Sequence, residues 1–84
     1  MNMDMQRAQA YQSRTADAEN EIRDIVSVSR ASPDEAIRRI QKGFASGVLH
    51  EWVETTDELG DAPASYSTDR GRLVALVNAA MLDA

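Results

Sequence analysis

The clearest pattern along the chain lies in its middle, where apolar residues recur at steps of three and four. Steps of this size place side chains on one side of an α-helix, which has about 3.6 residues per turn. We call this set the apolar ridge, and its members are Ile37, Ile40, Phe44, Val48 and Trp52. The ridge predicts a helix over residues 33–59 and is expected to form the centre of the core.

Residues at both ends of this segment mark its limits. A serine, a proline and two acids occupy positions 32–35. Serine is a favoured N-cap, proline is favoured at the first helical position, and acids in the first turn interact favourably with the helix dipole. We therefore predict Ser32 as the N-cap and Pro33 as the first residue. Gly60 predicts that the helix ends at about Leu59.

A seam of small and apolar residues with heptad-like spacing precedes this helix and predicts another over residues 4–30. The seam consists of Ala8, Tyr11, Thr15, Ala18, Ile22, Ile25 and Ser29. Its bulky aliphatic members come late, so the N-terminal half has little to bury. This half is therefore expected to be either loosely packed or covered by a neighbouring chain, and in the second case Tyr11 would be an intermolecular contact.

A broad apolar face near the end of the chain predicts a third helix over residues 68–82, capped by Ser67 or Thr68. The members of this face are Leu73, Val74, Leu76, Val77, Ala80 and Met81. No segment alternates with a period of two, so no strand is expected.

The predicted fold is all-α: a helical hairpin plus a third C-terminal helix, forming a small three-helix bundle. The link at residues 31–32 is short, and a short link favours antiparallel packing of the first two helices. All 84 residues are expected to form a single domain (1–84). A domain of this size buries a modest fraction of its surface, and the chain has no cysteine for a disulfide, so we expect a homo-oligomer.

The charge of the chain restricts its partners. Fourteen acids against nine Lys and Arg give a net charge of −5, and the estimated pI is 4.6. This sign disfavours direct binding to nucleic acid and leaves open a basic protein surface, including one that normally holds nucleic acid. The chain has no apolar run of membrane-spanning length and no secretory signal pattern at its start, so we expect a cytoplasmic protein.

The second predicted helix also offers candidate partner-binding residues. Leu49 and Val53 widen its apolar surface beyond the ridge, and Trp52 is either core or an interface anchor. Gly43 and Gly47 lie four residues apart inside the helix, where glycine is costly. Three interpretations are open: another helix packs closely against them, a ligand or partner binds there, or the glycines are tolerated without a role.

Candidate chemistry is sparse. His50 and Glu54 share a helix flank, but two ligands are only a fragment of a metal site, and His50 is better placed to contact a partner. No serine lies in a nucleophile elbow, and no glycine-rich phosphate loop is present. We therefore expect no enzyme activity, no metal and no cofactor.

Basic residues near two predicted helix starts suggest a second kind of site, for a small anionic ligand. With Tyr11, the candidates are Arg38, Arg39, Arg70 and Arg72. The five residues 40–44 (Ile-Gln-Lys-Gly-Phe) also resemble the second-helix signature of small helical phage proteins that sequester cyclic-nucleotide immune signals. This resemblance implies a phage protein in which Tyr11 and Arg23 hold a nucleotide, although this chain adds a third helix and lacks a recognisably placed lysine.

Two functions follow from the sequence. The leading hypothesis is a small non-enzymatic interaction protein, an inhibitor or adaptor that occupies a surface of a larger protein. The alternative is an oligomeric binder that sequesters an anionic small molecule such as a nucleotide signal. Both place the functional surface on helices and require no catalytic group.

Overall fold

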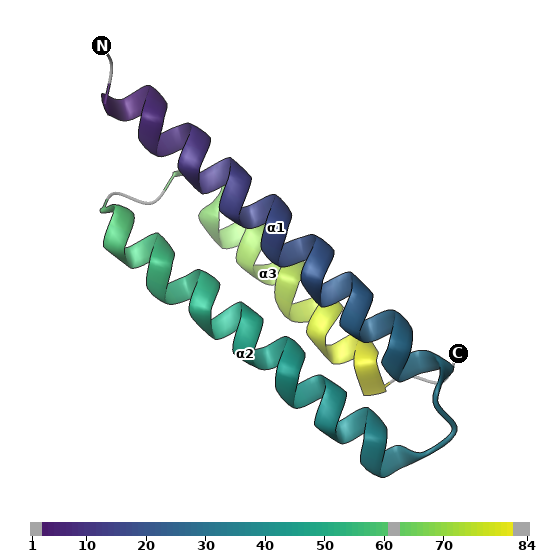
Figure 1. Cartoon of the computed structure of the whole chain (residues 1–84). Coiled ribbons are helices and arrows are strands. Elements are labelled where there is room, and N and C mark those ends of the chain that lie inside the picture. The colour runs from purple at the N-terminus through teal and green to yellow at the C-terminus, as the bar shows by residue number, and fades with distance from the viewer. Residues whose placement is uncertain (1–2, 61–62, 82–84) are drawn as a thin grey trace.

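The computed structural model describes the backbone of residues 3–60 and 63–81, and within these ranges the side chains from residue 5 onward. It contains three α-helices, α1 (Met3–Ala31), α2 (Glu35–Leu59) and α3 (Tyr66–Asn78), and a final 3₁₀ turn, η1 (Ala79–Met81). The described residues include no strand. The helices lie side by side in a rod of 51 × 18 × 18 Å, with α1 and α2 antiparallel and α3 along one side of that pair (Figure 1). The all-α bundle predicted from the sequence is confirmed.

The link between α1 and α2 uses a different cap from the one predicted. The N-cap is Asp34, whose Oδ1 accepts a hydrogen bond of 2.9 Å from the backbone N–H of Ala36. The Ser32 hydroxyl oxygen instead accepts from the backbone N–H of Asp34 at 3.2 Å. Aspartate and serine cap equally well. Capping at Asp34 leaves Pro33 outside the helix, where its missing N–H costs nothing.

The end of α2 agrees with the sequence, but the start of α3 does not. Gly60 terminates α2 with φ of 96°, a conformation that favours glycine. The helix α3 begins at Tyr66 after Ser65, which makes no capping side-chain hydrogen bond, so the predicted caps Ser67 and Thr68 are wrong. The predicted loop residues 61 and 62, and residue 82 of the predicted third helix, lie outside the described residues.

A cluster of three aromatic rings joins the three helices and explains the early start of α3. The rings of Trp52 and Tyr66 are stacked, with centroids 5.2 Å apart and an interplanar angle of 7°. The ring centroid of Tyr11 is 6.1 Å from that of the same indole. Because Tyr66 contacts Trp52 from the first turn of α3, packing sets the helix start in place of a side-chain cap.

The Tyr11 side chain is buried inside its own chain, not exposed for a neighbouring one as the sequence suggested. Its hydroxyl donates a hydrogen bond to Oδ2 of Asp69 in α3. The helix α3 therefore packs against α1 at Tyr11 and Glu19, whereas residues 5–9 of α1 stay exposed. The rest of the core comprises Ala18, Ile22, Val26, Ala45, Trp52, Leu73, Val77 and Ala80, of which Val26 and Ala45 lie outside the predicted apolar patterns.

The environment of Tyr11 leads to a prediction about alkaline stability. Burial raises the pKa of the Tyr11 phenol above its ordinary value of 10.0, and the hydrogen bond to Asp69 raises this pKa further. The folded state therefore binds the phenolic proton more tightly than the unfolded state does. The resulting stabilisation is complete below about pH 10 and is lost as the pH rises through the folded-state pKa. In urea titrations from pH 8 to 11, Tyr11→Phe should lose less stability at high pH than the wild type, and parallel losses would contradict this assignment.

The apolar ridge does not form the centre of the core, contrary to the prediction. Trp52 is 2% exposed and Val48 is half-buried, but Ile37, Ile40 and Phe44 are exposed. Four residues turn an α-helix by about 40° more than one full turn. Apolar residues spaced four apart therefore shift gradually around the helix instead of staying on one side. Two such steps put Phe44 about 80° away from the direction of Trp52.

Hydrogen bonds of Trp52 determine which side of α2 faces inward. Its indole Nε1–H donates to the hydroxyl oxygen of Thr15 at 2.9 Å, and that hydroxyl donates to the carbonyl oxygen of Tyr11 at 2.7 Å. With the indole held against α1, the side of α2 that carries Ile37, Ile40 and Phe44 faces solvent, and the neighbouring side of its first half faces the core. The residues buried or half-buried there are Arg38, Gln41, Lys42 and Ala45.

Candidate protein-binding face

Exposed apolar side chains gather at the end of the rod where α1 joins α2. We call this surface the outer face, and its residues are Val28 of α1 (58% exposed) with Ile37 (42%), Ile40 (57%) and Phe44 (58%) of α2. They are four of the six large apolar side chains that are exposed in the described part of the chain. A contiguous apolar surface on a small protein marks an interaction site more often than scattered single residues do.

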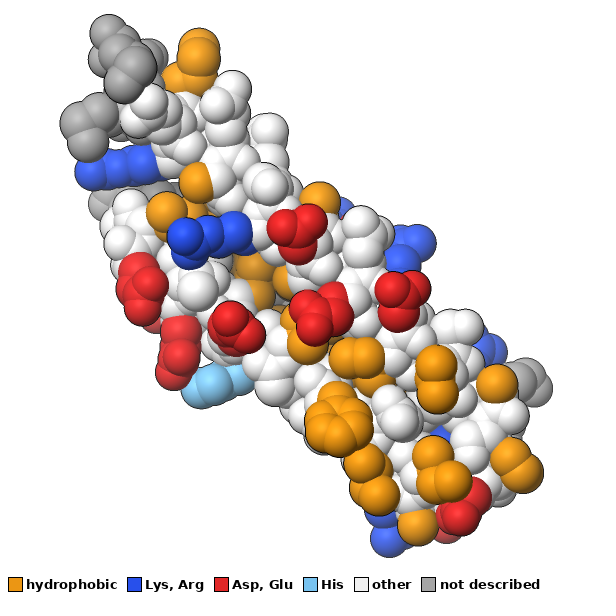
Figure 2. Space-filling model, in the orientation of Figure 1, with side chains coloured by type: hydrophobic (Ala, Val, Ile, Leu, Met, Phe, Trp, Pro, Cys, Tyr) orange, Lys and Arg blue, Asp and Glu red, His pale blue; other side chains and the backbone are white. Residues whose placement is uncertain are grey.

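The outer face lies on the side of the α1–α2 pair that α3 does not cover. Glu21 and Val48 line the same groove between the two antiparallel helices, so position 28 of α1 is level with about position 41 of α2. Val28 thus lies beside Ile40. Figure 2 shows hydrophobic side chains gathered over the first half of α2 and the end of α1, and acidic side chains farther along the same side.

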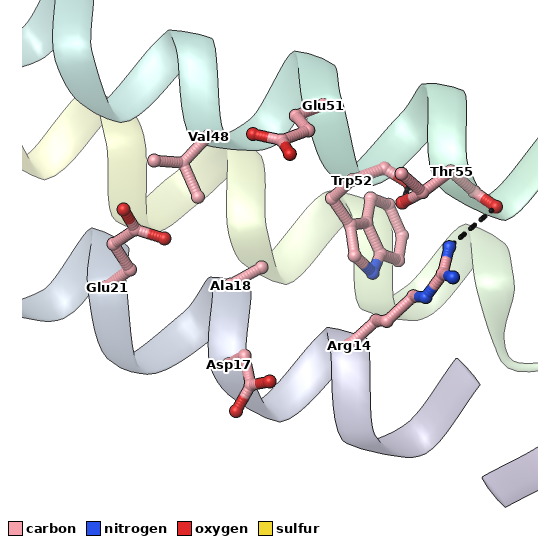
Figure 3. A pocket seen from close by; sticks show the side chains of 8 residues that line it. All are labelled: Arg14, Asp17, Ala18, Glu21, Val48, Glu51, Trp52 and Thr55. Carbon is pink, nitrogen blue, oxygen red and sulfur yellow. Dashed lines mark hydrogen bonds between the residues drawn. The ribbon is translucent and has the colours of Figure 1, made fainter. Parts of the chain in front are cut away.

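A groove between α1 and α2 continues the outer face toward the middle of the rod. Its volume is about 340 Å³, and Val48, one helical turn after Phe44, connects the two surfaces. The floor includes Ala18 and the edge of Trp52, as Figure 3 shows. At one end the Arg14 guanidinium donates a hydrogen bond of 3.4 Å to the carbonyl oxygen of Thr55.

Three acidic residues line this groove, Asp17 and Glu21 from α1 and Glu51 from α2. Figure 3 shows the carboxylates of Glu21 and Glu51 in the space between the helices and that of Asp17 directed away from α2. None of the three forms an ion pair with any residue that the structure describes. Arg14 is the one cation among the lining residues. The groove is therefore an acidic site next to an apolar one, on a chain that is already acidic.

The partner-binding residues predicted around Trp52 are less exposed than the outer face. Leu49 and Val53 are half-buried against the core, and Trp52 is enclosed by Tyr11, Thr15 and Tyr66. Trp52 is thus a core residue of this chain, which is the first of the two roles that the sequence left open for it.

The glycines of α2 and His50 lie on the solvent side. A Cβ atom built on Gly43 or Gly47 would meet nothing within 4 Å, so no close approach within the chain requires these glycines. His50 is exposed, and its Nε2 lies 3.0 Å from Oε1 of Glu54. The described residues contain no group of three or more potential metal ligands.

The open space around these glycines gives a stability prediction. Alanine is favoured over glycine by about 0.5–1 kcal/mol at an exposed position inside a helix. The double variant Gly43→Ala/Gly47→Ala should therefore raise the free energy of unfolding by about 1–2 kcal/mol in urea titration. A loss of stability would show that the backbone at these positions is packed more closely than the structure shows.

The five candidate anion-binding residues are distributed over both ends of the molecule. Arg38 and Arg39 lie in the first turns of α2, whereas Arg70 and Arg72 lie at the start of α3, beside the far end of α2. The rise of α2 alone separates the two pairs by roughly 30 Å. Arg39 contacts Glu35 at 3.0 Å, Arg72 contacts Glu19 at 3.1 Å, and Tyr11 is buried. A single chain therefore does not bring these side chains into one anion site.

Sequence reasoning missed the residues that the outer face and groove depend on most. Val28 stood outside the predicted seam of the first helix, and Asp17, Glu21 and Glu51 were not among the predicted site residues. Their signal was available in principle, because Val28 lies three residues after Ile25 and the acids Asp17 and Glu21 lie one turn apart. Their common side became visible only once the rotation of α2 was known.

No protein-family model, curated protein or solved structure matches this chain. No helix in the described ranges is long and apolar enough to cross a membrane.

Proposed function

We propose that this chain is a non-enzymatic interaction protein, an inhibitor or adaptor, which binds a larger protein through its outer face. The observation that carries this proposal is the exposure of Val28, Ile37, Ile40 and Phe44 on one side of a hairpin whose other side is covered by α3 (Figure 1). The partner surface is expected to be apolar, with basic residues beside it.

The pattern of burial supports a binding role over a merely incomplete core. Trp52 and Leu73 are almost fully enclosed, and buried hydroxyls are satisfied, as in the Ser29 hydroxyl that donates to the carbonyl oxygen of Ala80 at 2.7 Å. The core is therefore well formed without the outer face. The exposed residues are extra apolar surface, which contributes little to the fold and is available to another molecule.

The acidic groove favours a different protein over a second copy as the occupant. Each chain carries a net charge of −5, so two chains repel one another at long range. The self-association predicted from the small size of the chain stays a separate prediction, which light scattering measures directly. A second copy seated on the outer face would exclude the partner.

Site-specific photocrosslinking in the cells that carry the gene tests the proposal. A benzoylphenylalanine placed at Ile40 reports on the outer face, and one placed at Met5, which is 60% exposed at the opposite end of α1, serves as the matched control. We expect one specific protein to be crosslinked from position 40 and not from position 5.

Three other results would contradict the proposal. Crosslinking of position 40 only to a second copy would make the outer face a dimer interface. Equal yields of the same adduct from positions 5 and 40 would show non-specific contact. The absence of any adduct from position 40 would show that the face is not occupied.

A further inference from the structure

We infer that the partner segment bound on the outer face and groove is an amphipathic helix, apolar at one end and rich in lysine or arginine at the other. This inference rests on the proposed function and specifies the chemistry of the partner. It follows from the shape of the free surface, from its order of apolar and acidic residues, and from the lack of ion pairs between the groove acids and any residue that the structure describes.

The shape of the surface fits a helix. Two antiparallel helices form a shallow trough on each side, and α3 fills one of them (Figure 1). The opposite trough, from Ile37 to Thr55, has a length of about 27 Å, which equals that of an 18-residue helix. A helix laid there would complete a four-helix arrangement, and helices commonly bind into such apolar grooves.

The order of side chains along the trough sets the pattern of the occupant. Apolar residues extend from Ile37 to Val48, a rise of about 16 Å, and the carboxylates follow. Glu51 is seven residues after Phe44, which is about 10 Å or two helical turns. A bound helix therefore needs its basic residues about two turns beyond the centre of its apolar group.

The residues that line the groove include three acids and one cation, Arg14, so the groove carries an excess of negative charge. Asp17, Glu21 and Glu51 form no ion pair with any described residue, and Arg14 is engaged with the carbonyl oxygen of Thr55. A second copy would not neutralise them. In a parallel pair its own acids would face these acids, and in an antiparallel pair joined through the outer faces both grooves would stay uncovered.

A selection of displayed peptides tests the inference although the identity of the partner is open. A library of 18-residue helices with randomised apolar, acidic, basic and neutral positions is selected against the immobilised full chain. We expect the enriched helices to carry an apolar group and, about two turns away, at least two lysines or arginines. The most enriched helix is then synthesised with a fluorescent label and used as the probe.

Affinity of this probe for matched variants separates the apolar and charged contributions. Glu21→Gln/Glu51→Gln should raise Kd at least about ten-fold and weaken its salt dependence, because it removes two charges from the groove. The control, Glu54→Gln/Asp57→Asn, removes two charges from the solvent side of α2 and should leave Kd within about two-fold. Phe44→Glu should abolish binding.

Each alternative result has a defined meaning. Enriched helices without basic residues, or an unchanged Kd of the probe for Glu21→Gln/Glu51→Gln, would overturn the inference. If Phe44→Glu nevertheless lost binding of the probe, the proposed function would still stand, because the outer face would still be the binding surface. If no helix were enriched, the inference that the occupant is a helix would be overturned. A dimer that Phe44→Glu dissociates, without any effect on probe binding, would make a second copy the occupant and overturn both proposals.

Discussion

Phe44→Glu is expected to abolish binding to the partner protein while leaving the fold intact. Phe44 is 58% exposed at the centre of the outer face, between Ile40 and Val48. Loss of a central aromatic anchor costs about 2–4 kcal/mol of binding free energy, on the order of 30- to 1,000-fold in Kd. Glutamate also places a carboxylate in a contact that is otherwise apolar, and the cost of burying that charge should bring the effect toward the upper end of this range.

The fold should tolerate this change because Phe44 contributes little to the core. Surface substitutions alter stability by less than about 0.5 kcal/mol, and glutamate is a better helix former than phenylalanine. The measurements are calorimetric titration with the crosslinked partner and urea unfolding of the variant. Met5→Glu, with the same change at a residue of similar exposure, is the control and should bind normally. Retained binding by Phe44→Glu, or equal loss by Met5→Glu, would refute the role of the outer face.

Trp52→Ala is expected to remove a large part of the stability of the chain. Truncation of a buried Trp costs about 3–5 kcal/mol, and a domain of this size has a total stability of roughly 4–13 kcal/mol. The variant also loses the stacking partner of Tyr66 and the donor to the Thr15 hydroxyl. Because these contacts join all three helices, the remaining helices lose their mutual packing together.

Circular dichroism and urea titration measure this loss. Trp52→Phe serves as the graded control, since it keeps an aromatic ring for Tyr66 and removes the indole donor, and it should be destabilised by less than Trp52→Ala. The opposite ranking, or native-like stability of Trp52→Ala, would show that the aromatic cluster does not organise the bundle. Such a result would also weaken the explanation for the exposure of Phe44, which depends on the position of Trp52.

The sequence predicted the helices well because their signals are local. The seam from Ala18 to Ser29 and the glycine at position 60 act within a few residues, and the structure confirms the helices that they indicate. The start of α3 could not be predicted in this way. It depends on Tyr66 stacking against Trp52, a contact between two helices that no local pattern records.

The candidate site was predicted only in part. The sequence indicated that α2 has more apolar surface than its own chain covers, and it assigned the excess to Leu49, Trp52 and Val53. The excess lies at Ile37, Ile40 and Phe44, because the hydrogen bond between the indole and Thr15 rotates α2 away from the ridge. The absolute rotation of a helix is set by long-range contacts, so periodicity alone cannot decide which of two neighbouring stripes is buried.

The most direct test of the account uses the single phenylalanine of the chain. Incorporation of fluorophenylalanine gives one ¹⁹F resonance, which reports on Phe44 alone. A soluble paramagnetic agent should relax this resonance strongly in the free protein at every concentration, and addition of the partner should protect it. A resonance that is already protected in the free chain at low concentration, or that stays fully accessible in the complex, would contradict the claim that the outer face is where another protein binds.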